Sequence, residues 1–192
     1  MDVAADWRPF ERVERLAPPA LRSWLAEPGL LTARIRALFG DRMRFRMLGP
    51  LRVAQVPDEL QRRLGLREPS CLLREIEFCC DAERVVYAQT VLPDATLDAH
   101  PWLRELGDSP IGETLRRADA PLDREPLEYA SLPLDSALAL AACADSRSAS
   151  GDALWARRAV YRLGGRPILV QEVFLPALLR AADPATGSRT TS

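Results

Sequence analysis

Two pairs of β-rich segments, each joined by a short turn, constrain the fold of this 192-residue chain most strongly. The pairs are Cys71–Cys80 with Arg84–Pro93, joined by Asp81-Ala82-Glu83, and Leu154–Leu163 with Pro167–Leu175, joined around Gly164-Gly165-Arg166. Connections this short predict β-hairpins, and the two glycines supply the positive φ that tight turns need. Two hairpins in one chain predict an antiparallel sheet.

The rest of the chain predicts short helices and a few further strands. Helical patterns cover Ala20–Glu27, Ala33–Phe39 after a Thr32 cap, Pro57–Leu66, Pro101–Leu106 and Ile111–Arg117, while strand patterns cover Met43–Val56 (bent at Gly49-Pro50) and Arg124–Ala130. Helices separate from strands indicate an α+β domain with helices on one face of the sheet. We expect one domain over residues 1–180, an excursion from the core at Leu132–Ser150, and a disordered tail at 181–192.

Composition excludes several classes of function. The 26 basic residues are all arginine and are balanced by 27 acidic residues, so the net charge of −1 disfavours binding to nucleic acid. The absence of lysine excludes Schiff-base chemistry and the phosphate-loop lysine. His100 is the only histidine, and the four cysteines form no C-x-x-C pair, so we expect reduced thiols and no metal site.

No segment of the sequence predicts secretion or a membrane span. The N-terminus lacks the continuous apolar stretch of a signal peptide, and the longest apolar run, Ala137–Ala144, is far shorter than the roughly 20 residues that a spanning helix needs. A cytoplasmic protein is the expectation.

Two charged residues stand in apolar rows of the predicted strands. Side chains alternate along a strand, so Arg74 shares a face with Leu72, Ile76 and Phe78, and Glu172 shares a face with Ile168, Val170 and Phe174. An unpaired charge on such a face costs several kcal/mol. Either the two charges meet in one buried cavity, or they form a structural ion pair, or the exposed and buried faces are the reverse of this assignment.

Two further features point to an anionic ligand. Arg157 stands in a similar row, although Arg158 on the alternate face is equally available. In Asp108-Ser109-Pro110-Ile111-Gly112, Asp108 or Ser109 can cap a helix whose first N–H groups, at Ile111 and Gly112, remain free for an anion. Gly112 allows close approach of a ligand or of backbone, and a tight helix entry explains it equally well.

At these residues the sequence resembles the chorismate pyruvate-lyase family. The matching stretches are Trp24-Leu25 with Leu30-Leu31-Thr32, CLLREIEFC from Cys71 to Cys79, YAQTVLP from Tyr87 to Pro93, SPIGETL from Ser109 to Leu115, and WARRAVYRLGGRPILVQEVFLP from Trp155 to Pro176. They occur in order over most of residues 20–178. Each stretch alone is weak, whereas the ordered set is specific.

The resemblance implies a six-stranded antiparallel sheet, helical flaps over an enclosed ligand site, and the conversion of chorismate to 4-hydroxybenzoate and pyruvate for ubiquinone synthesis, without a cofactor and by a monomer. It places the catalytic pair at Arg74 and Glu172, with backbone contacts at Ile111 and Leu31. Glu172 is expected to contact the 4-hydroxyl end and assist proton transfer. Arg157 is a weaker candidate for the enolpyruvyl carboxylate.

The sequence departs from the family pattern at two positions. Gln89 replaces an arginine and Ala156 replaces a glycine, and the first change puts a second anionic anchor in doubt. The alternative function is a non-catalytic binding module for an aromatic carboxylate, because the fold also resembles the effector domain of HutC-type regulators. Those regulators carry a separate DNA-binding domain, for which the residues before Trp24 leave no room. The third alternative is a structural domain.

Overall fold

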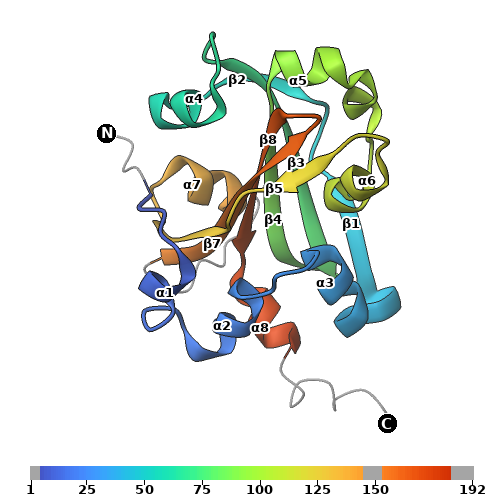
Figure 1. Ribbon diagram of the computed structural model, residues 1–192. Helices are drawn as coiled ribbons and strands as arrows, with labels where there is room; N and C mark the ends of the chain where they lie inside the picture. Colours follow the sequence, from blue (N-terminus) through green and yellow to red (C-terminus); the bar gives the residue numbers. More distant parts are fainter. Residues whose placement is uncertain (1–4, 145–152, 183–192) are drawn as a thin grey trace.

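A sheet built around two long hairpins forms the centre of the computed structural model, which describes residues 5–144 and 153–182 (Figure 1). Its central strands are β3 (Ser70–Cys80), β4 (Glu83–Leu92), β7 (Ala153–Leu163) and β8 (Arg166–Phe174). Strand β4 pairs antiparallel with β8, so the order of the four strands is β3-β4-β8-β7. Both predicted hairpins are confirmed, and the pairing of β4 with β8 joins them into one sheet.

The two hairpin turns adopt the backbone conformations that their residues favour. Gly164 and Gly165 have φ of 54° and 79°, as predicted, and Asp81 in the other turn has φ of 53°. A two-residue turn with positive φ matches the twist of the paired strands, and Asp tolerates this region better than most residues with a side chain. The turns therefore set the register of both hairpins.

Four short strands extend the sheet, namely β1 (Met43–Met47), β2 (Arg52–Gln55), β5 (Leu122–Arg124) and β6 (Glu128–Pro133). Strands β1 and β2 pair with different parts of β3, and β5 and β6 pair with β7. The sheet thus has eight strands where about six were expected, and the strand predicted at Arg124–Ala130 is divided in two. Pro126, which has no N–H to donate, lies at the division.

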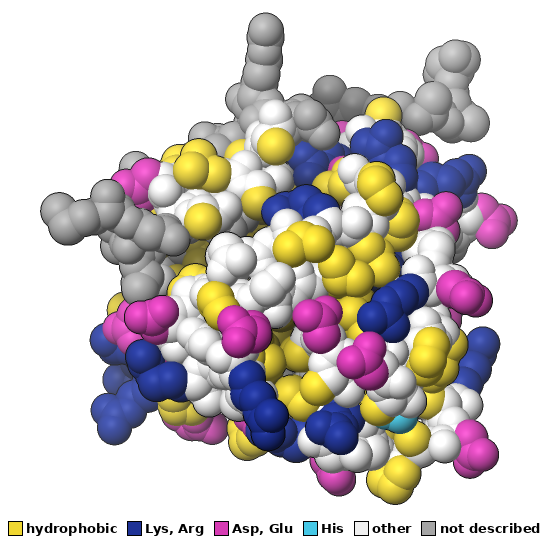
Figure 2. Space-filling model, turned by 90° about the horizontal axis from the view of Figure 1, so that it is seen from above, with side chains coloured by type: hydrophobic (Ala, Val, Ile, Leu, Met, Phe, Trp, Pro, Cys, Tyr) yellow, Lys and Arg dark blue, Asp and Glu magenta, His cyan; other side chains and the backbone are white. Residues whose placement is uncertain are grey.

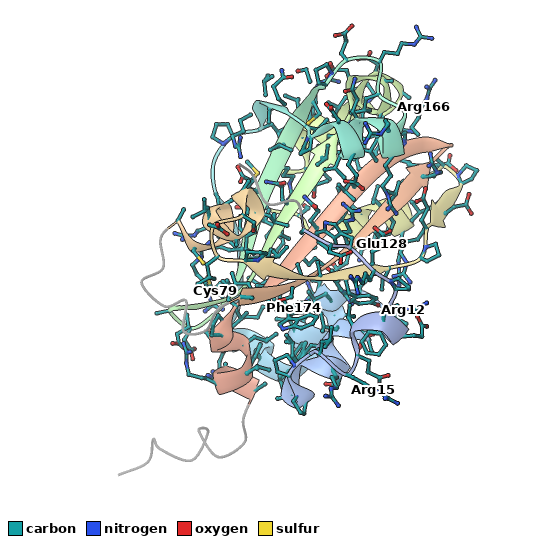
Figure 3. The ribbon with its side chains drawn as sticks, turned by 90° about the vertical axis from the view of Figure 1, so that its left-hand side faces the viewer. Arg12, Arg15, Cys79, Glu128, Arg166 and Phe174 are labelled. Carbon is teal, nitrogen blue, oxygen red and sulfur yellow. The ribbon has the colours of Figure 1, made fainter. Side chains whose placement is uncertain are left out.

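Most of the helices cover one face of the sheet, as expected, and the α+β class is confirmed. They are α1 (Phe10–Val13), α2 (Pro19–Leu25), α3 (Leu31–Phe39), α5 (Asp94–Ala99), α6 (Ile111–Arg117) and α8 (Pro176–Ala182), together with the 3-10 segments Gly40–Arg42 and Pro101–Glu105. Their apolar side chains pack on the sheet face that carries Ile76, Ile168 and Phe174. In Figure 3, Phe174 lies at the end of β8 nearer the N-terminal helices and Arg166 at the opposite end.

Two helices pack on the other face, so the expectation that helices cover only one face is wrong for these two. Helix α4 (Asp58–Leu64) places Leu60 and Leu64 in a cluster with Leu169, and α7 (Ala137–Cys143) packs against Val173. The central strands carry apolar side chains on both faces, and each face needs a packed layer to bury them. The Leu132–Ser150 segment is accordingly no simple excursion, because Leu132 belongs to β6 and α7 joins the core.

Two predicted helix caps are corrected by the structure. Helix α3 begins at Leu31, so Thr32 lies inside its first turn and is buried instead of capping it. Helix α6 has Pro110 at its N-cap position and no side-chain cap. Asp108 instead accepts a hydrogen bond from the Met47 N–H at 3.0 Å, which ties the start of α6 to the edge strand β1.

The C-terminal helix ends close to the boundary predicted for the domain. Helix α8 extends to Ala182, two residues beyond the predicted domain boundary. The rest of the predicted tail lies outside the described residues, as does the end of the Leu132–Ser150 segment.

None of the described helices has the length and apolarity needed to cross a membrane. On the face shown in Figure 2, arginine and carboxylate side chains are interspersed, in line with the near-zero net charge.

Helix α3 offers a direct test of the core. Ile35 is fully buried against the sheet, whereas Leu38 on the same helix is 49% exposed. We expect Ile35→Ala to lower the free energy of unfolding by about 2–5 kcal/mol, because it leaves a cavity, and Leu38→Ala to change it by only about 0.5 kcal/mol. Urea denaturation of the two variants measures the difference, and equal losses would contradict this packing.

Candidate active site

An enclosed cavity lies between the sheet and two connecting segments that form its roof. Its floor consists of side chains from the four central strands, and its roof consists of residues 29–32 and 110–112. The floor residues are Ile76, Phe78, Ala88, Thr90, Arg157, Tyr161, Val170 and Glu172, with Phe45 from β1. Because Ala88 and Thr90 are small, the floor is hollowed at the centre of the sheet.

The two roof segments touch each other above the cavity. A Cβ on Gly112 would lie 2.6 Å from Cδ2 of Leu30, so the glycine at the start of α6 permits close approach of the α2–α3 connector. Arg36 on α3 and Glu113 on α6 form an ion pair at 2.8 Å that also links the two segments. The close neighbour of Gly112 is thus the Leu30 side chain of the other roof segment, and neither a ligand nor backbone as expected from the sequence.

Glu172 faces the cavity and pairs with Arg157. The Arg157 Nε donates to the Glu172 carboxylate at 2.5 Å, and the two residues are register partners on β7 and β8. Nη1 of Arg157 donates to the backbone oxygen of Glu27 in the α2–α3 connector at 2.7 Å. The partner of Glu172 is therefore Arg157 and not Arg74, and the same arginine joins the floor to the roof.

Arg74 is a buried cation with too few partners. It is 1% exposed, and its Nη2 donates to the backbone oxygens of Gly107 and Ser109, both at 2.7 Å. Its Nε and Nη1 have no hydrogen-bond partner among the described residues. Burial lowers the pKa of Arg74 to about 10, opposed by the charge of Asp108. A buried guanidinium with free donors of this kind is suited to an anion.

Arg74 stands at the edge of the enclosed cavity. Its register partner Thr90 lines the cavity, and its guanidinium carbon lies 5.7 Å from the centre of the Phe45 ring, which lines it too. Arg74 itself lines a neighbouring open hollow formed with Leu51 and with the segment Leu103–Gly107. Arg74 therefore lines the open hollow, while two of its neighbours, Thr90 and Phe45, line the cavity.

The other predicted residues lie around the same cavity. Leu31 and Ile111, chosen for backbone contacts, are the first residues of α3 and α6 and line the roof. The N–H groups at the start of a helix have no partner within the helix. The structure thus brings Leu31, Ile111, Arg157 and Glu172 to one cavity, with Arg74 beside it.

Gln89, Ala156 and Arg158 lie on the opposite face of the sheet. Gln89 donates to the Tyr87 hydroxyl and accepts from Gln171, far from the roof segments. Strand alternation places Arg158 beside it and Arg157 on the cavity face, which resolves the choice between the two arginines. The two departures from the family pattern, at Gln89 and Ala156, therefore do not touch the cavity.

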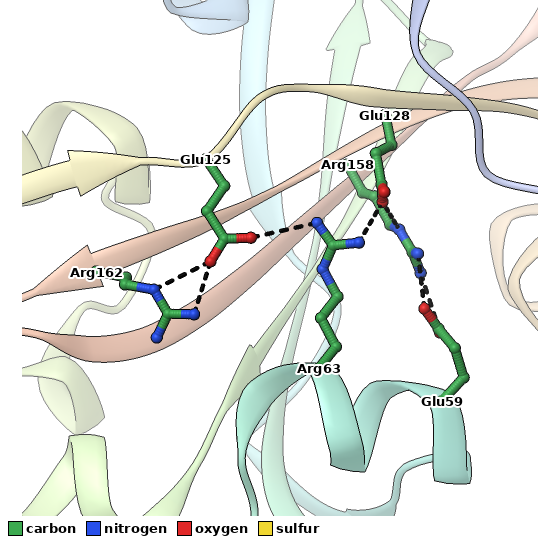
Figure 4. A network of polar contacts seen from close by, with 6 residues as sticks. All are labelled: Glu59, Arg63, Glu125, Glu128, Arg158 and Arg162. Carbon is green, nitrogen blue, oxygen red and sulfur yellow. Dashed lines mark hydrogen bonds and ion pairs between the residues drawn. The ribbon is translucent and has the colours of Figure 1, made fainter.

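Arg158 belongs to an ionic network that holds α4 against the sheet (Figure 4). Its members are Glu59, Arg63, Glu125, Glu128, Arg158 and Arg162. Three arginines and three glutamates balance in charge, and Glu128 accepts from both Arg63 and Arg158, at 2.7 and 2.8 Å. This network is structural, because its carboxylates neutralise its cations.

Sequence reasoning missed Tyr161, and it also missed Arg124, the register partner of Tyr161 on β5. Tyr161 lines the cavity in the same row of β7 as Arg157, so strand alternation contained the signal. Burial raises its pKa, as does the charge of Glu172, whereas Arg124 lowers it by charge and by a hydrogen bond. Arg124 had no such signal, because β5 was predicted as part of a longer strand. No group of three or more His, Cys, Asp or Glu suited to a metal occurs within residues 5–144 and 153–182.

Solved structures define the class of fold. A GntR-family transcriptional regulator from Bacillus cereus superposes with a TM-score of 0.53 at 12% identity, covering 71% of this chain and 94% of that one. The C-terminal domain of the histidine utilization repressor from Pseudomonas syringae gives 0.53 at 13% identity, with 71% and 93% covered. At these identities the likeness concerns the fold alone, and it agrees with the α+β class.

Sequence comparison identifies the family. The model described as chorismate lyase matches residues 1–182, and the chain belongs to that family. It is 41% identical to a probable chorismate pyruvate-lyase of an Azoarcus species, over 90% of this chain and 92% of the relative. Probable chorismate pyruvate-lyases of Thiobacillus denitrificans and Methylococcus capsulatus are 42% and 38% identical, covering 85% and 86% of this chain and 86% and 100% of the relatives.

The ion pair between Arg157 and Glu172 is testable without any ligand. The side chains are 3% and 18% exposed, so removal of the cation leaves a largely buried carboxylate unpaired. We expect Arg157→Met to lower the free energy of unfolding by about 3–5 kcal/mol near neutral pH. The double variant Arg157→Met/Glu172→Gln should recover part of that loss in urea denaturation. A double variant no more stable than the single one would show that the pair carries no such coupling.

Proposed function

We propose that this protein is a carbon–oxygen lyase that eliminates pyruvate from chorismate and leaves 4-hydroxybenzoate. The observation that carries the proposal is the placement of an under-partnered, buried Arg74 on the same sheet face as the Glu172 carboxylate, which lines the cavity, while Arg74 lies beside it. Membership of the chorismate lyase family supports the assignment. Action as a monomer in the cytoplasm remains part of the proposal, and it rests on the sequence.

The spacing of the two charged groups suits a ring with substituents at opposite ends. Arg74 is on β3 and Glu172 on β8, and only β4 separates the two strands. Neighbouring strands lie about 4.8 Å apart, so the backbones of β3 and β8 are roughly 10 Å apart. We place the substrate ring between these two side chains, with its carboxylate toward Arg74.

Arg74 would bind the ring carboxylate through the donors that have no partner in the free protein. Nε and one Nη of a guanidinium form a fork that matches the two oxygens of a carboxylate. The backbone N–H groups of Leu31 and Ile111 are the proposed additional donors from the roof. Binding of the anion then neutralises a charge that the fold otherwise holds buried at a cost.

The elimination itself needs little from the protein, because the ring becomes aromatic. The proton on C4 leaves, and the electron pair of the C4–H bond stays behind and enters the ring. The C3–O bond then breaks, and the enolpyruvyl oxygen takes the electron pair of that bond. Protonation then converts enolpyruvate to pyruvate. Glu172 is proposed to lie at the C4 end and accept or relay the C4 proton, a role that requires hydrogen-bond reach of that position.

The proposed role of Arg157 is to position Glu172, and not to serve by itself as a substrate-binding group. Two of its donor nitrogens are already bonded, one to Glu172 and one to the Glu27 backbone oxygen. The carboxylate is therefore held in one orientation over the floor. Contact between the two roof segments limits the access of water, which strengthens electrostatic interactions inside the cavity.

Product analysis tests the function directly. Purified protein is incubated with chorismate in buffer containing EDTA, and 4-hydroxybenzoate and pyruvate are quantified. We expect equimolar products, a loss of kcat of about 10²-fold or more for Glu172→Gln if it transfers the proton, and a large rise in KM for Arg74→Ala. Chorismate that binds without turning over would instead favour the non-catalytic binding module.

Gln89 provides the matched control. It lies on β4 one position from the cavity residue Thr90, but its side chain is on the opposite face. We expect Gln89→Ala to leave kcat and KM within about two-fold of the parent, because surface or distant substitutions leave the site intact. A large kinetic effect of Gln89→Ala would mean that this face also takes part in binding.

A further inference from the structure

The proposed substrate carries two carboxylates, and Arg74 accounts for only one of them. The second belongs to the enolpyruvyl group, which is attached next to the carbon that Glu172 addresses. A binding site for it must therefore lie near Glu172 and must provide positive charge that Glu172 has not already neutralised. Arg157 does not provide it, because its charge is balanced by Glu172.

Arg124 is the cation that meets this requirement. It is the register partner of Tyr161, so both side chains are on the cavity face of the sheet. Its Nη1 donates to the backbone oxygen of Pro28 in the α2–α3 connector at 3.0 Å, which places the guanidinium at the rim where that connector covers β7. Because Tyr161 lines the cavity and is the register partner of Arg124, the two residues connect the rim to the cavity.

At this end of the cavity, the positive charge of Arg124 is not balanced by a carboxylate of the described residues. Arg157 and Glu172 cancel, and Arg124 forms no ion pair with any carboxylate in the described part of the chain. The acids closest in sequence are engaged or directed elsewhere, because Glu125 pairs with Arg63 and Arg162 on the other face. Arg124 is exposed, so an anion can reach its uncompensated guanidinium.

We propose that Arg124, together with the Tyr161 hydroxyl, binds the carboxylate of the enolpyruvyl group and so selects a dicarboxylate substrate. The Tyr161 hydroxyl, next to Arg124 in the sheet, has an O–H to donate to the anion. This assignment rests on the proposed function and deepens it. It supplies a second binding group for an anion. In the sequence, Gln89 leaves this group in doubt, and Arg157 is a weaker candidate for it.

The test compares two ligands that differ in this one group. Chorismate carries the enolpyruvyl carboxylate and 4-hydroxybenzoate does not, while both carry the ring carboxylate. We expect Arg124→Ala to raise KM for chorismate about 10- to 100-fold, as for loss of a hydrogen bond to a charged group, and to leave Ki for 4-hydroxybenzoate within about three-fold. Arg124→Lys should recover part of the loss, and Tyr161→Phe should raise KM several-fold.

Arg34 is the matched control for a role in holding the roof. It donates to the Ser23 hydroxyl and pairs with Glu27, so it holds the same connector without lining the cavity. If Arg124 acts only through Pro28, then Arg124→Ala and Arg34→Ala will shift both ligands alike, which overturns the proposal. An Arg124→Ala variant with both constants unchanged overturns it as well.

Failure of the proposed function is separable from failure of this assignment. If the parent protein forms no 4-hydroxybenzoate from chorismate, the lyase proposal fails. The assignment is then tested by calorimetric binding of chorismate and 4-hydroxybenzoate, with the same selective loss expected in Arg124→Ala. If the parent protein turns over chorismate and the variant loses both ligands equally, only the assignment fails.

Discussion

The pairing of β4 with β8 is the interaction on which the rest of this structure depends. Each hairpin has its own register, but only this pairing places Arg74 of the first hairpin and Glu172 of the second on one face of one sheet. The row that joins them passes over Ala88 and Thr90, whose small side chains leave the hollow that becomes the cavity floor. Larger residues in those two positions would fill the space between the charges.

Arginine side chains connect the floor of the cavity to its roof. Arg157 and Arg124 donate to the consecutive backbone oxygens of Glu27 and Pro28, and Arg74 donates to those of Gly107 and Ser109. Backbone oxygens are neutral acceptors, so they satisfy donors without cancelling charge. Arg74 and Arg124 can therefore hold the cover in place and still attract an anion, whereas the charge of Arg157 is balanced by Glu172.

The face of the sheet opposite the cavity carries polar residues that bond to one another. They show why the role of a single charged residue in a strand is hard to predict from the sequence. Gln89 and Arg158 are as polar as Thr90 and Arg157 beside them in the chain, yet Gln89 bonds to Tyr87 and Gln171, and Arg158 bonds within the balanced network under α4. Gln89, which stands where the family pattern has an arginine, is thus not among the residues that line the cavity. Alternation separates the two functions completely, because neighbours in a strand point in opposite directions.

Local sequence patterns were enough to predict several features of this fold. These are the two hairpins with their positive-φ turns, the apolar rows that contain Arg74 and Glu172, and the starts of α3 and α6 to within a residue or two. These features depend on side-chain alternation and on backbone preferences, which act over a few residues. Only the tertiary structure decided that Glu172 pairs with Arg157, that α4 and α7 cover the second face, that Pro126 divides a strand, and that Arg124 reaches the rim. Each of these depends on residues distant in sequence, such as Glu27 with Arg157, whose contact is set by packing of whole elements and not by any local pattern.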